Sequence, residues 1–138
     1  REEENIMPPR VVNDTVIWLS ALYFSGKTAK IVSLIEDKSI ISVTSDFILQ
    51  EFQEKLVEFG TPLSAAQGTA GYVASISEVV QTKGKSFNLR DPEDNPVLET
   101  AIVGKCSFLI TRDKDLLSIG KYDQIQIVTP YQFLSSKK

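Results

Sequence analysis

Apolar runs of two different periods alternate along this chain. Short continuous runs such as RVVND (10–14) and CSFLIT (106–111) have the length of buried strands, whereas TSDFILQEFQEKLVEFG (44–60) repeats its apolar residues at helical spacing. Strands that alternate with helices through short connections form a mostly parallel sheet with helices on both faces. The alternation therefore predicts an α/β protein with three layers, in the order α/β/α.

Five strands are expected along the chain, at 10–14, 39–43, 84–89, 106–111 and 124–128. Between them the spacing predicts helices at 15–24, 26–38, 44–60, 63–81, 96–105 and 113–119, and a final turn at 131–134. Thr44 or Ser45 would cap the third helix and Gly60 would end it. The helix at 63–81 is the weakest of these predictions, because Gly68 and Gly71 interrupt it. Frayed ends are expected at 1–9 and 135–138.

The 138 residues suffice for one domain with its own core, ordered from about residue 10 to 134. The hydrophobic content of 42%, with no apolar run of bilayer-spanning length, predicts a soluble globular protein that does not enter membranes. The N-terminal stretch REEENIMPPR has no apolar segment typical of a secretory signal. The single cysteine, Cys106, is expected to be a buried small hydrophobe, and the whole pattern favours a cytoplasmic protein.

Histidine is absent from the chain, and this limits the chemistry it can perform. Catalysis by Ser-His-Asp or Cys-His pairs, ribonuclease chemistry based on imidazole, and nearly all zinc sites are excluded. Any catalysis must use carboxylates and other oxygen ligands. The net charge of −3 gives no overall attraction for nucleic acid, so a phosphate-binding face would have to be a local patch.

Four acids fall at positions where they could meet. Asp14 and Asp113 each stand where a strand ends and a helix begins, and ligands of parallel sheets bind at the carboxyl ends of the strands. Asp94 heads the apolar stripe of the helix at 96–105, and Glu51 flanks the stripe of the helix at 44–60. Four carboxylates in one place repel one another unless protons or cations neutralise them. Mg²⁺ or Mn²⁺, which prefer oxygen ligands, would do so without histidine.

Each acid also has a purely structural interpretation. Asp14, Asp113 and Asp91 stand at helix N-cap positions, and Asp94 could serve only as a first-turn acid that favours the helix dipole. Glu51 could be a solvated flank residue. Asp115 is expected to be the exposed partner of Arg112 or Lys114. Helix capping accounts for each aspartate separately, but it does not explain why they fall on one edge of the sheet.

Four segments of the chain resemble the successive blocks of a PIN domain, in particular the branch described as toxins of bacterial toxin-antitoxin systems (VapC-like). They are RVVNDTVIWLSAL, SVTSDFILQEF, RDPEDNPVLETAIVGKCSFLITRDKDLL and IQIVTPYQFL, and together they extend over about residues 10–134. The third block is the most specific. The resemblance implies a PIN-like α/β/α fold with a five-stranded, mainly parallel sheet.

The resemblance also implies a function and a set of site residues. PIN domains resemble other nucleases that hold one or two Mg²⁺ or Mn²⁺ ions with clustered acids to hydrolyse RNA phosphodiester bonds. By position, the family's acids correspond to Asp14, Glu51, Asp94 and Asp113, with Thr111 and Asp91 in supporting places. An RNA substrate, a cognate antitoxin protein and a homodimer are the implied partners. Candidates for contact with substrate phosphates are Lys27, Arg112 and Lys114.

Two departures from the family pattern bear on activity. The family usually has an apolar residue before its first aspartate and an asparagine two residues after it; here these positions hold Asn13 and Val16. If the asparagine orients the aspartate or the substrate, Val16 weakens the enzyme. The alternative function is then a catalytically weakened module that docks an arginine-bearing protein at its acidic pocket. A receiver-like phosphatase, with a phosphorylated aspartate, is disfavoured because no D-x-D pair follows the first strand.

Overall fold

Six strands form one sheet in the computed structural model, which describes residues 7–24 and 26–136. In spatial order they run β3-β2-β1-β4-β6-β5, and every neighbouring pair is parallel except β5 and β6. In chain order the strands are β1 (Arg10–Asn13), β2 (Ile41–Ser45), β3 (Ser77–Val80), β4 (Phe108–Ile110), β5 (Lys121–Tyr122) and β6 (Ile125–Val128).

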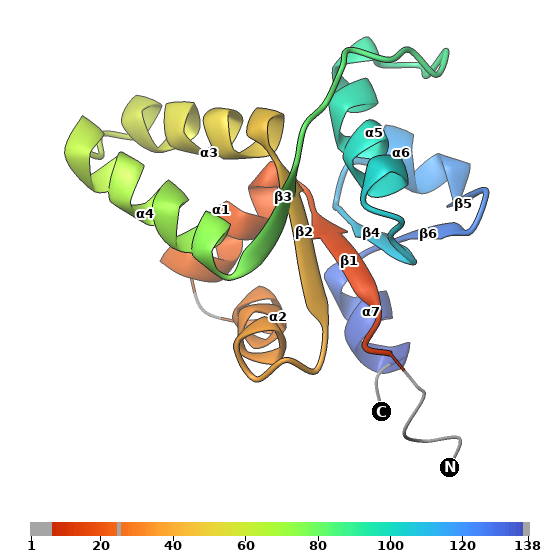
Figure 1. The fold of residues 1–138 in the computed structure, drawn as a ribbon, viewed down its shortest axis with the longest axis horizontal. Helices are drawn as coiled ribbons and strands as arrows, with labels where there is room; N and C mark the ends of the chain where they lie inside the picture. The colour runs from red at the N-terminus through yellow and green to blue at the C-terminus, as the bar shows by residue number, and fades with distance from the viewer. Residues whose placement is uncertain (1–6, 25, 137–138) are drawn as a thin grey trace.

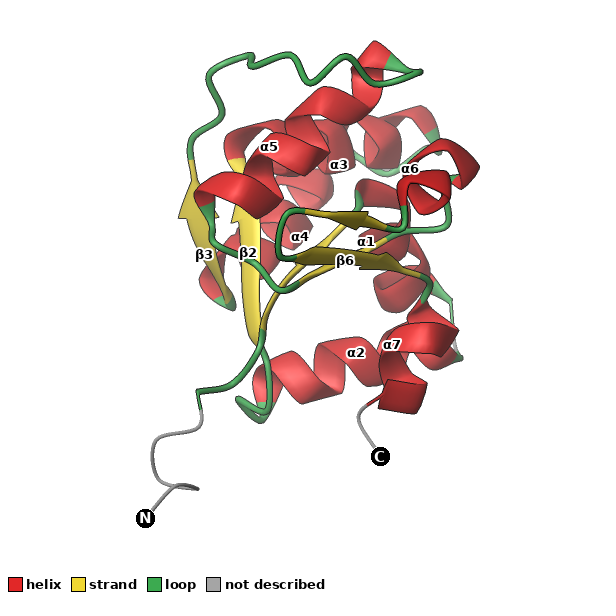
Figure 2. Ribbon diagram, turned by 90° about the vertical axis from the view of Figure 1, so that its right-hand side faces the viewer, coloured by secondary structure: helices red, strands yellow, loops and turns green. Residues whose placement is uncertain are grey.

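Helices flank the sheet, as the alternating pattern predicted. Figure 1 shows α1 to α4 gathered on one side of strands β1 and β2, with α5 and α6 on the other. Figure 2 shows α2 and α7 side by side, and these two helices pack against each other. The helices are α1 (Thr15–Tyr23), α2 (Lys27–Glu36), α3 (Asp46–Glu58), α4 (Leu63–Ser75), the short 3-10 helix η2 (Pro92–Asp94), α5 (Asn95–Val103), α6 (Lys114–Ile119) and α7 (Pro130–Ser136). No helix in the described ranges is long and apolar enough to cross a bilayer.

Local sequence determines several element ends. The Ser45 side chain caps α3 by accepting a hydrogen bond from the backbone N–H of Ile48 (3.3 Å), so the serine of the two predicted caps is the one used. Gly60, with φ of 101°, follows the end of α3 in the left-handed conformation that glycine adopts without strain. At the centre of the sheet, Val11 and Val12 of β1 are fully buried, as a parallel strand covered on both faces requires.

The prediction of a five-stranded sheet is wrong, because the set of segments that form strands differs from the predicted set. The end of the predicted helix at 63–81 is instead β3, which pairs with β2, so the ladder with β2 overrides the weak helical pattern there. The predicted strand at 84–89 is an irregular segment, because the side chains of Glu99 and Asn95 engage its backbone N–H groups. The two-residue strand β5 was not predicted.

Two smaller expectations concern the chain ends and Cys106. The predicted turn at 131–134 lies within helix α7, which continues to Ser136, so fraying from residue 135 is wrong for Ser135 and Ser136. Residues 1–6, 137 and 138, where fraying was also predicted, lie outside the described residues. Cys106 is buried as predicted, and this burial raises the pKa of its thiol to about 12.

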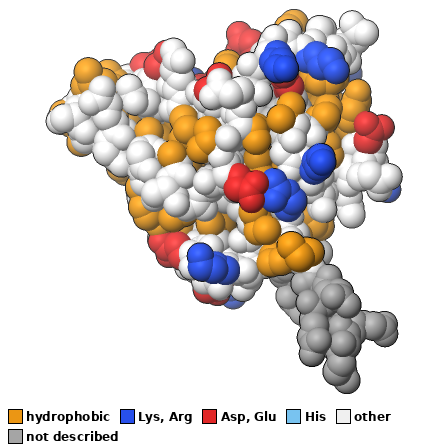
Figure 3. Space-filling model, viewed as in Figure 1, with side chains coloured by type: hydrophobic (Ala, Val, Ile, Leu, Met, Phe, Trp, Pro, Cys, Tyr) orange, Lys and Arg blue, Asp and Glu red, His pale blue; other side chains and the backbone are white. Residues whose placement is uncertain are grey.

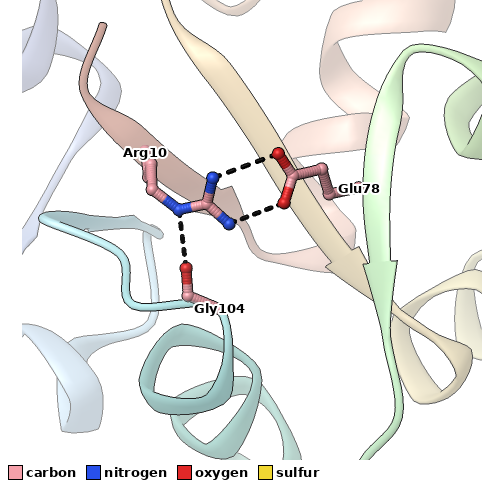
Figure 4. Close-up of polar contacts among 3 residues, drawn as sticks. All are labelled: Arg10, Glu78 and Gly104. Carbon is pink, nitrogen blue, oxygen red and sulfur yellow. Dashed lines mark hydrogen bonds and ion pairs between the residues drawn. The ribbon is translucent and has the colours of Figure 1, made fainter. Parts of the chain in front are cut away.

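One polar cluster ties together three segments at the amino ends of the strands (Figure 4). The guanidinium of Arg10 in β1 donates two hydrogen bonds to the Glu78 carboxylate of β3 (2.7 and 3.1 Å), across the intervening strand β2. Its Nε also donates to the backbone oxygen of Gly104, just after α5 (2.8 Å). The cluster therefore links the edge strand β3 and the end of α5 to the central strand.

Candidate active site

Asp14 and Asp113 lie at the same edge of the sheet. Asp14 directly follows β1, and Asp113 comes three residues after the end of β4. The two strands are parallel neighbours, with Asn13 opposite Ile110. Strand order reverses between them, because the chain proceeds from β1 to β2 and β3 on one side before β4 forms on the other. The two aspartates therefore flank a switch point, the place where open α/β sheets bind ligands.

A single hydroxyl connects these two aspartates. Thr111 Oγ1 donates a hydrogen bond to Asp14 Oδ2 (2.8 Å) and accepts one from the backbone N–H of Asp113 (3.0 Å). Asp14 Oδ1 accepts a further bond from the backbone N–H of Thr15 (2.7 Å). Burial raises the pKa of Asp14, and the negative charges of Glu51 and Asp113 raise it further. The hydrogen bonds that Asp14 accepts from Thr111 and Thr15 oppose this shift. Thr111 thus lies between the two aspartates and fixes their separation.

Glu51 reaches the site from the middle of α3. Its Oε1 accepts a hydrogen bond of 2.5 Å from the hydroxyl of Thr15, a buried residue in the first turn of α1. The carboxylate is half-buried instead of solvated on the helix flank. Sequence reasoning missed Thr15, although its place directly after Asp14 was a signal that could have identified it.

Asp94 is the most perturbed acid of the site. Burial and a hydrogen bond shared with the carboxyl of Asp113 raise the pKa of Asp94 to about 8, and the negative charges of Asp113, Asp91 and Asp14 add to the effect. Asp94 accordingly lies within electrostatic range of three other acids. A shift of this kind, caused by burial and named charge partners, is typical of functional sites.

Asp115 also belongs to this neighbourhood, contrary to the prediction that it is an exposed partner of Arg112 or Lys114. One carboxylate oxygen from each of Asp91, Asp94 and Asp115 lies within 4.8 Å of the others, a spacing suited to a metal ion. Asp115 is half-buried and forms its ion pair with Arg90 instead (3.6 Å). Little in the sequence pointed to this residue, because its place depends on the start of α6.

The structural role expected for three of the acids is also present. Asp14 is the N-cap of α1, Asp91 of η2 and Asp113 of α6. Asp91 accepts from the backbone N–H of Glu93 (3.0 Å) and Asp113 from that of Asp115 (3.1 Å). Capping occupies one oxygen of each carboxylate, so the second oxygen of Asp91 and of Asp113 is available for other contacts. These aspartates can therefore cap helices and also belong to the acidic site.

The three cations suggested for phosphate contact lie in different places. The ammonium of Lys27 lies 5.4 Å from the centre of the Tyr131 ring, in a hollow between α2 and α7 whose lining includes none of the four acids. Arg112 is exposed and lines an apolar groove together with Val16 of α1 and Phe59 at the end of α3. Lys114 is exposed at the start of α6, next to Asp113. Arg112 and Lys114 thus adjoin Asp113 in the chain, whereas Lys27 packs on an aromatic ring.

Both departures from the family pattern are visible at β1 and α1. Asn13 is buried, and its Oδ1 has no hydrogen-bond partner among the residues that the structure describes. Val16 is 50% exposed in the first turn of α1. An asparagine at this position would therefore be open to solvent or to a ligand.

Comparison with protein families gives a consistent match. The model of the family described as PIN domain matches residues 10–115. An uncharacterized protein of Methanocaldococcus jannaschii, MJ1680, is 31% identical over 141 residues, which cover 91% of this chain and 89% of the relative.

Solved structures resemble the fold at low sequence identity. VapBC2 of Rickettsia felis, bound to a DNA fragment from its promoter, gives a TM-score of 0.60 at 12% identity, covering 86% of this chain and 96% of that chain. VapC20 of Mycobacterium tuberculosis, described as a Sarcin-Ricin loop cleaving toxin, gives 0.58 at 13% identity, with 84% and 98% covered. PAE2754 of Pyrobaculum aerophilum gives 0.53 at 15% identity, with 95% and 97% covered. At these identities the likeness concerns the fold alone.

Proposed function

Since this chain belongs to the PIN domain family, we propose that it is a divalent-metal-dependent endoribonuclease, and the toxin of a toxin-antitoxin pair. VapC20, a structure of similar fold that is described as a Sarcin-Ricin loop cleaving toxin, supports this choice. The observation that carries it is the perturbation of Asp94. A carboxyl whose pKa is raised to about 8 by burial and by neighbouring acids marks a place where negative charge is in excess and a bound cation would be stabilised.

The donor set fits Mg²⁺ or Mn²⁺. Carboxylate oxygens are the preferred ligands of these ions, and one such oxygen from each of Asp91, Asp94 and Asp115 lies within 4.8 Å of the others. In the proposed site Asp14, Asp94 and Asp113 are the metal ligands, and Glu51 either joins them or orients the attacking water. When bound, such ions activate water and neutralise charge on the scissile phosphate.

The remaining tasks fall to residues of the chain itself. Thr111 orients Asp14, and Thr15 holds Glu51 in the half-buried position from which it can accept a proton from water. Asp91 and Asp115 add negative charge beside Asp94. We infer that Arg112 and Lys114, the chain neighbours of Asp113, meet substrate phosphates, whereas the Tyr131 ring beside Lys27 favours a structural role for that lysine.

The test is cleavage of end-labelled single-stranded and structured RNAs in Mg²⁺, Mn²⁺ or EDTA. The wild type is compared with Asp14→Asn and Asp113→Asn, which keep the helix caps. Cleavage that requires metal and is lost in both variants supports the nuclease and its ligands. If the wild type cuts no RNA with either metal, the nuclease proposal fails.

A second candidate is a binding module with weakened catalysis, and the exposure of Val16 favours it. Val16 lies where the family has asparagine, and it lines an apolar groove with exposed Tyr23, Phe24 and Phe59. An antitoxin could occupy such a groove and place an arginine of its tail at the acids, so an antitoxin is a proposed partner of either form. Metal binding by calorimetry without RNA cleavage would favour this candidate. The homodimer remains a prediction.

A further inference from the structure

The segment from Gln81 to Arg90, QTKGKSFNLR, carries three cations and no acid. We call it the basic arm. Lys83, Lys85 and Arg90 are all exposed, and in Figure 3 blue side chains gather at the top of the molecule, where Figure 1 places the connection from β3 to α5. In a chain with a net charge of −3, the basic arm is a local positive patch.

A buried carboxylate fixes the backbone of the basic arm. Glu99 of α5 is only 3% exposed, and it accepts hydrogen bonds from the backbone N–H groups of Lys83 (2.7 Å), Gly84 (3.1 Å) and Lys85 (3.1 Å). Burial of a charged group is unfavourable unless it is hydrogen-bonded in this way. The three bonds hold the central turn of the arm against α5.

Two further side chains fix the arm on either side of this turn. Asp46 Oδ1 accepts from the backbone N–H of Thr82 (3.0 Å), and Asn95 Oδ1 accepts from that of Phe87 (3.0 Å). The basic arm therefore has no helix or strand of its own, yet side chains of α3 and α5 bind five of its backbone N–H groups. Its lysines are presented from a fixed backbone.

Within residues 7–24 and 26–136, the two lysines of the basic arm have no acidic partner. Among the described residues neither Lys83 nor Lys85 forms an ion pair, and the Glu99 carboxylate beneath them binds only backbone N–H groups. Phe87 and Leu89, the large apolar residues of the arm, are half-buried and pack against the core. The outer surface of the arm thus offers charge without the apolar anchors on which protein interfaces depend.

The basic arm leads directly into the acidic site. It starts at the carboxyl end of β3, which is parallel to β2 and β1, so it starts at the sheet edge where Asp14 lies. Its last residue, Arg90, directly precedes Asp91 and forms the ion pair with Asp115 (3.6 Å). Exposed cations and clustered acids are therefore consecutive along one edge.

We propose that the basic arm binds the phosphate backbone of the RNA strand that enters the acidic site, and that Glu99 is a positioning residue for this contact. The inference rests on the proposed nuclease function. Lysine contacts with phosphates carry no sequence information, so the arm contributes affinity and register while selectivity resides elsewhere.

Binding of labelled single-stranded RNA, measured by fluorescence anisotropy in Mg²⁺, tests the arm. The Asp14→Asn protein serves as background so that the RNA stays intact. Adding Lys83→Gln and Lys85→Gln should weaken binding by about tenfold at low salt, and should reduce the slope of log affinity against log salt by about 0.7 for every phosphate that the arm no longer neutralises. The matched control adds Lys38→Asn and Lys105→Asn, because these lysines precede β2 and β4 at the opposite edge of the sheet. Asparagine suits their positive φ of 67° and 53°.

The control should bind RNA as the background protein does. If the arm variant binds as tightly as the control, or if the background binds no RNA, the proposal is overturned. Cleavage by the wild type is followed separately on gels. If the wild type cleaves RNA and the arm variant binds RNA as tightly as the control, the role of the basic arm is refuted and the nuclease function is not. If the wild type does not cleave RNA, the nuclease function is refuted.

Glu99→Gln tests the positioning role, because it leaves every cation in place. Amide exchange at residues 83–85 should become faster, and RNA affinity should fall severalfold. Faster exchange with unchanged RNA affinity would contradict a need for a fixed arm. Because both lysines are exposed, their variants should fold normally. RNA binding by the basic arm can therefore be tested even if Glu99→Gln proves unstable.

Discussion

Thr111 Oγ1 donates to Asp14 Oδ2 at 2.8 Å while it accepts from the backbone N–H of Asp113, so one hydroxyl sets the relative position of two acids from different strands. Thr111→Val keeps the shape but removes both bonds. We expect a loss of about 10- to 100-fold in metal affinity or cleavage rate. Thr111→Ser retains the hydroxyl and should stay near the wild type. Equal metal affinities for all three proteins by calorimetry would contradict this role.

The raised pKa of Asp94 predicts how stability depends on pH when metal is absent. The pKa is about 8 in the folded protein against an ordinary value of 3.8, so the protonated form is favoured by folding. Its contribution to stability is complete below pH 3.8 and is lost as the pH rises through about 8. In EDTA the amount by which protonated Asp94 raises the Tm should therefore decrease as the pH rises from 3.8 to about 8.

The Asp94→Asn variant isolates this contribution, because its side chain is neutral at every pH. Its Tm in EDTA should decline less than that of the wild type between about pH 4 and 8, a window bounded by the two pKa values. Added Mg²⁺ should raise the wild-type Tm most at the upper end. Parallel Tm curves for wild type and variant would show that Asp94 is not perturbed.

Gly104 should tolerate no side chain. A Cβ added there would lie 2.4 Å from Val43 Cγ1 and 3.0 Å from the backbone oxygen of Thr100. Gly104→Ala should reduce the free energy of unfolding by about 1–3 kcal/mol, measured by urea denaturation. Gly68→Ala is the control, because nothing lies within 4 Å of its Cβ in α4. There the helix propensity of alanine should add up to about 1 kcal/mol. Equal effects at the two sites would refute the steric argument.

The Arg10–Glu78 pair should contribute little by itself. The side chains are 30% and 55% exposed, so solvent screens their attraction despite the two hydrogen bonds. A double-mutant cycle with Arg10→Met and Glu78→Gln should give a coupling of about 0.2–1 kcal/mol. Arg10→Met alone should be the more harmful change, because it also removes the bond to Gly104. A larger loss from Glu78→Gln would contradict this order.

Restoring the family residue at position 16 should increase activity. Val16 is half exposed, so asparagine fits there without steric conflict. Val16→Asn should raise the RNA cleavage rate, while Val16→Thr, which is similar in size to valine, should not. If Val16→Asn leaves the rate unchanged, the asparagine is dispensable in this chain.

Strand ends could be predicted from the sequence, and this is why Asp14 and Asp113 were placed at the correct edge of the sheet. A buried run followed by aspartate fixes an acid at the carboxyl edge whatever the details of the helices. Segments without a clear hydrophobic period were harder to predict from the sequence. Residues 77–80 become a strand because β2 offers a partner, and residues 83–85 become a loop because Glu99, far along the chain, takes their N–H groups. Asp115 was misassigned because its neighbours Asp91 and Arg90 are close only in space.

Three acids of the site also hold helix starts, and this limits how the site could decay during evolution. Asparagine caps a helix about as well as aspartate, whereas alanine costs about 1 kcal/mol at such a position. Inactive descendants of this chain should therefore have accumulated asparagine at Asp14, Asp91 and Asp113, because that route loses charge without losing the fold. Glu51 caps no helix, but its replacement by an apolar residue would leave the buried hydroxyl of Thr15 without its acceptor.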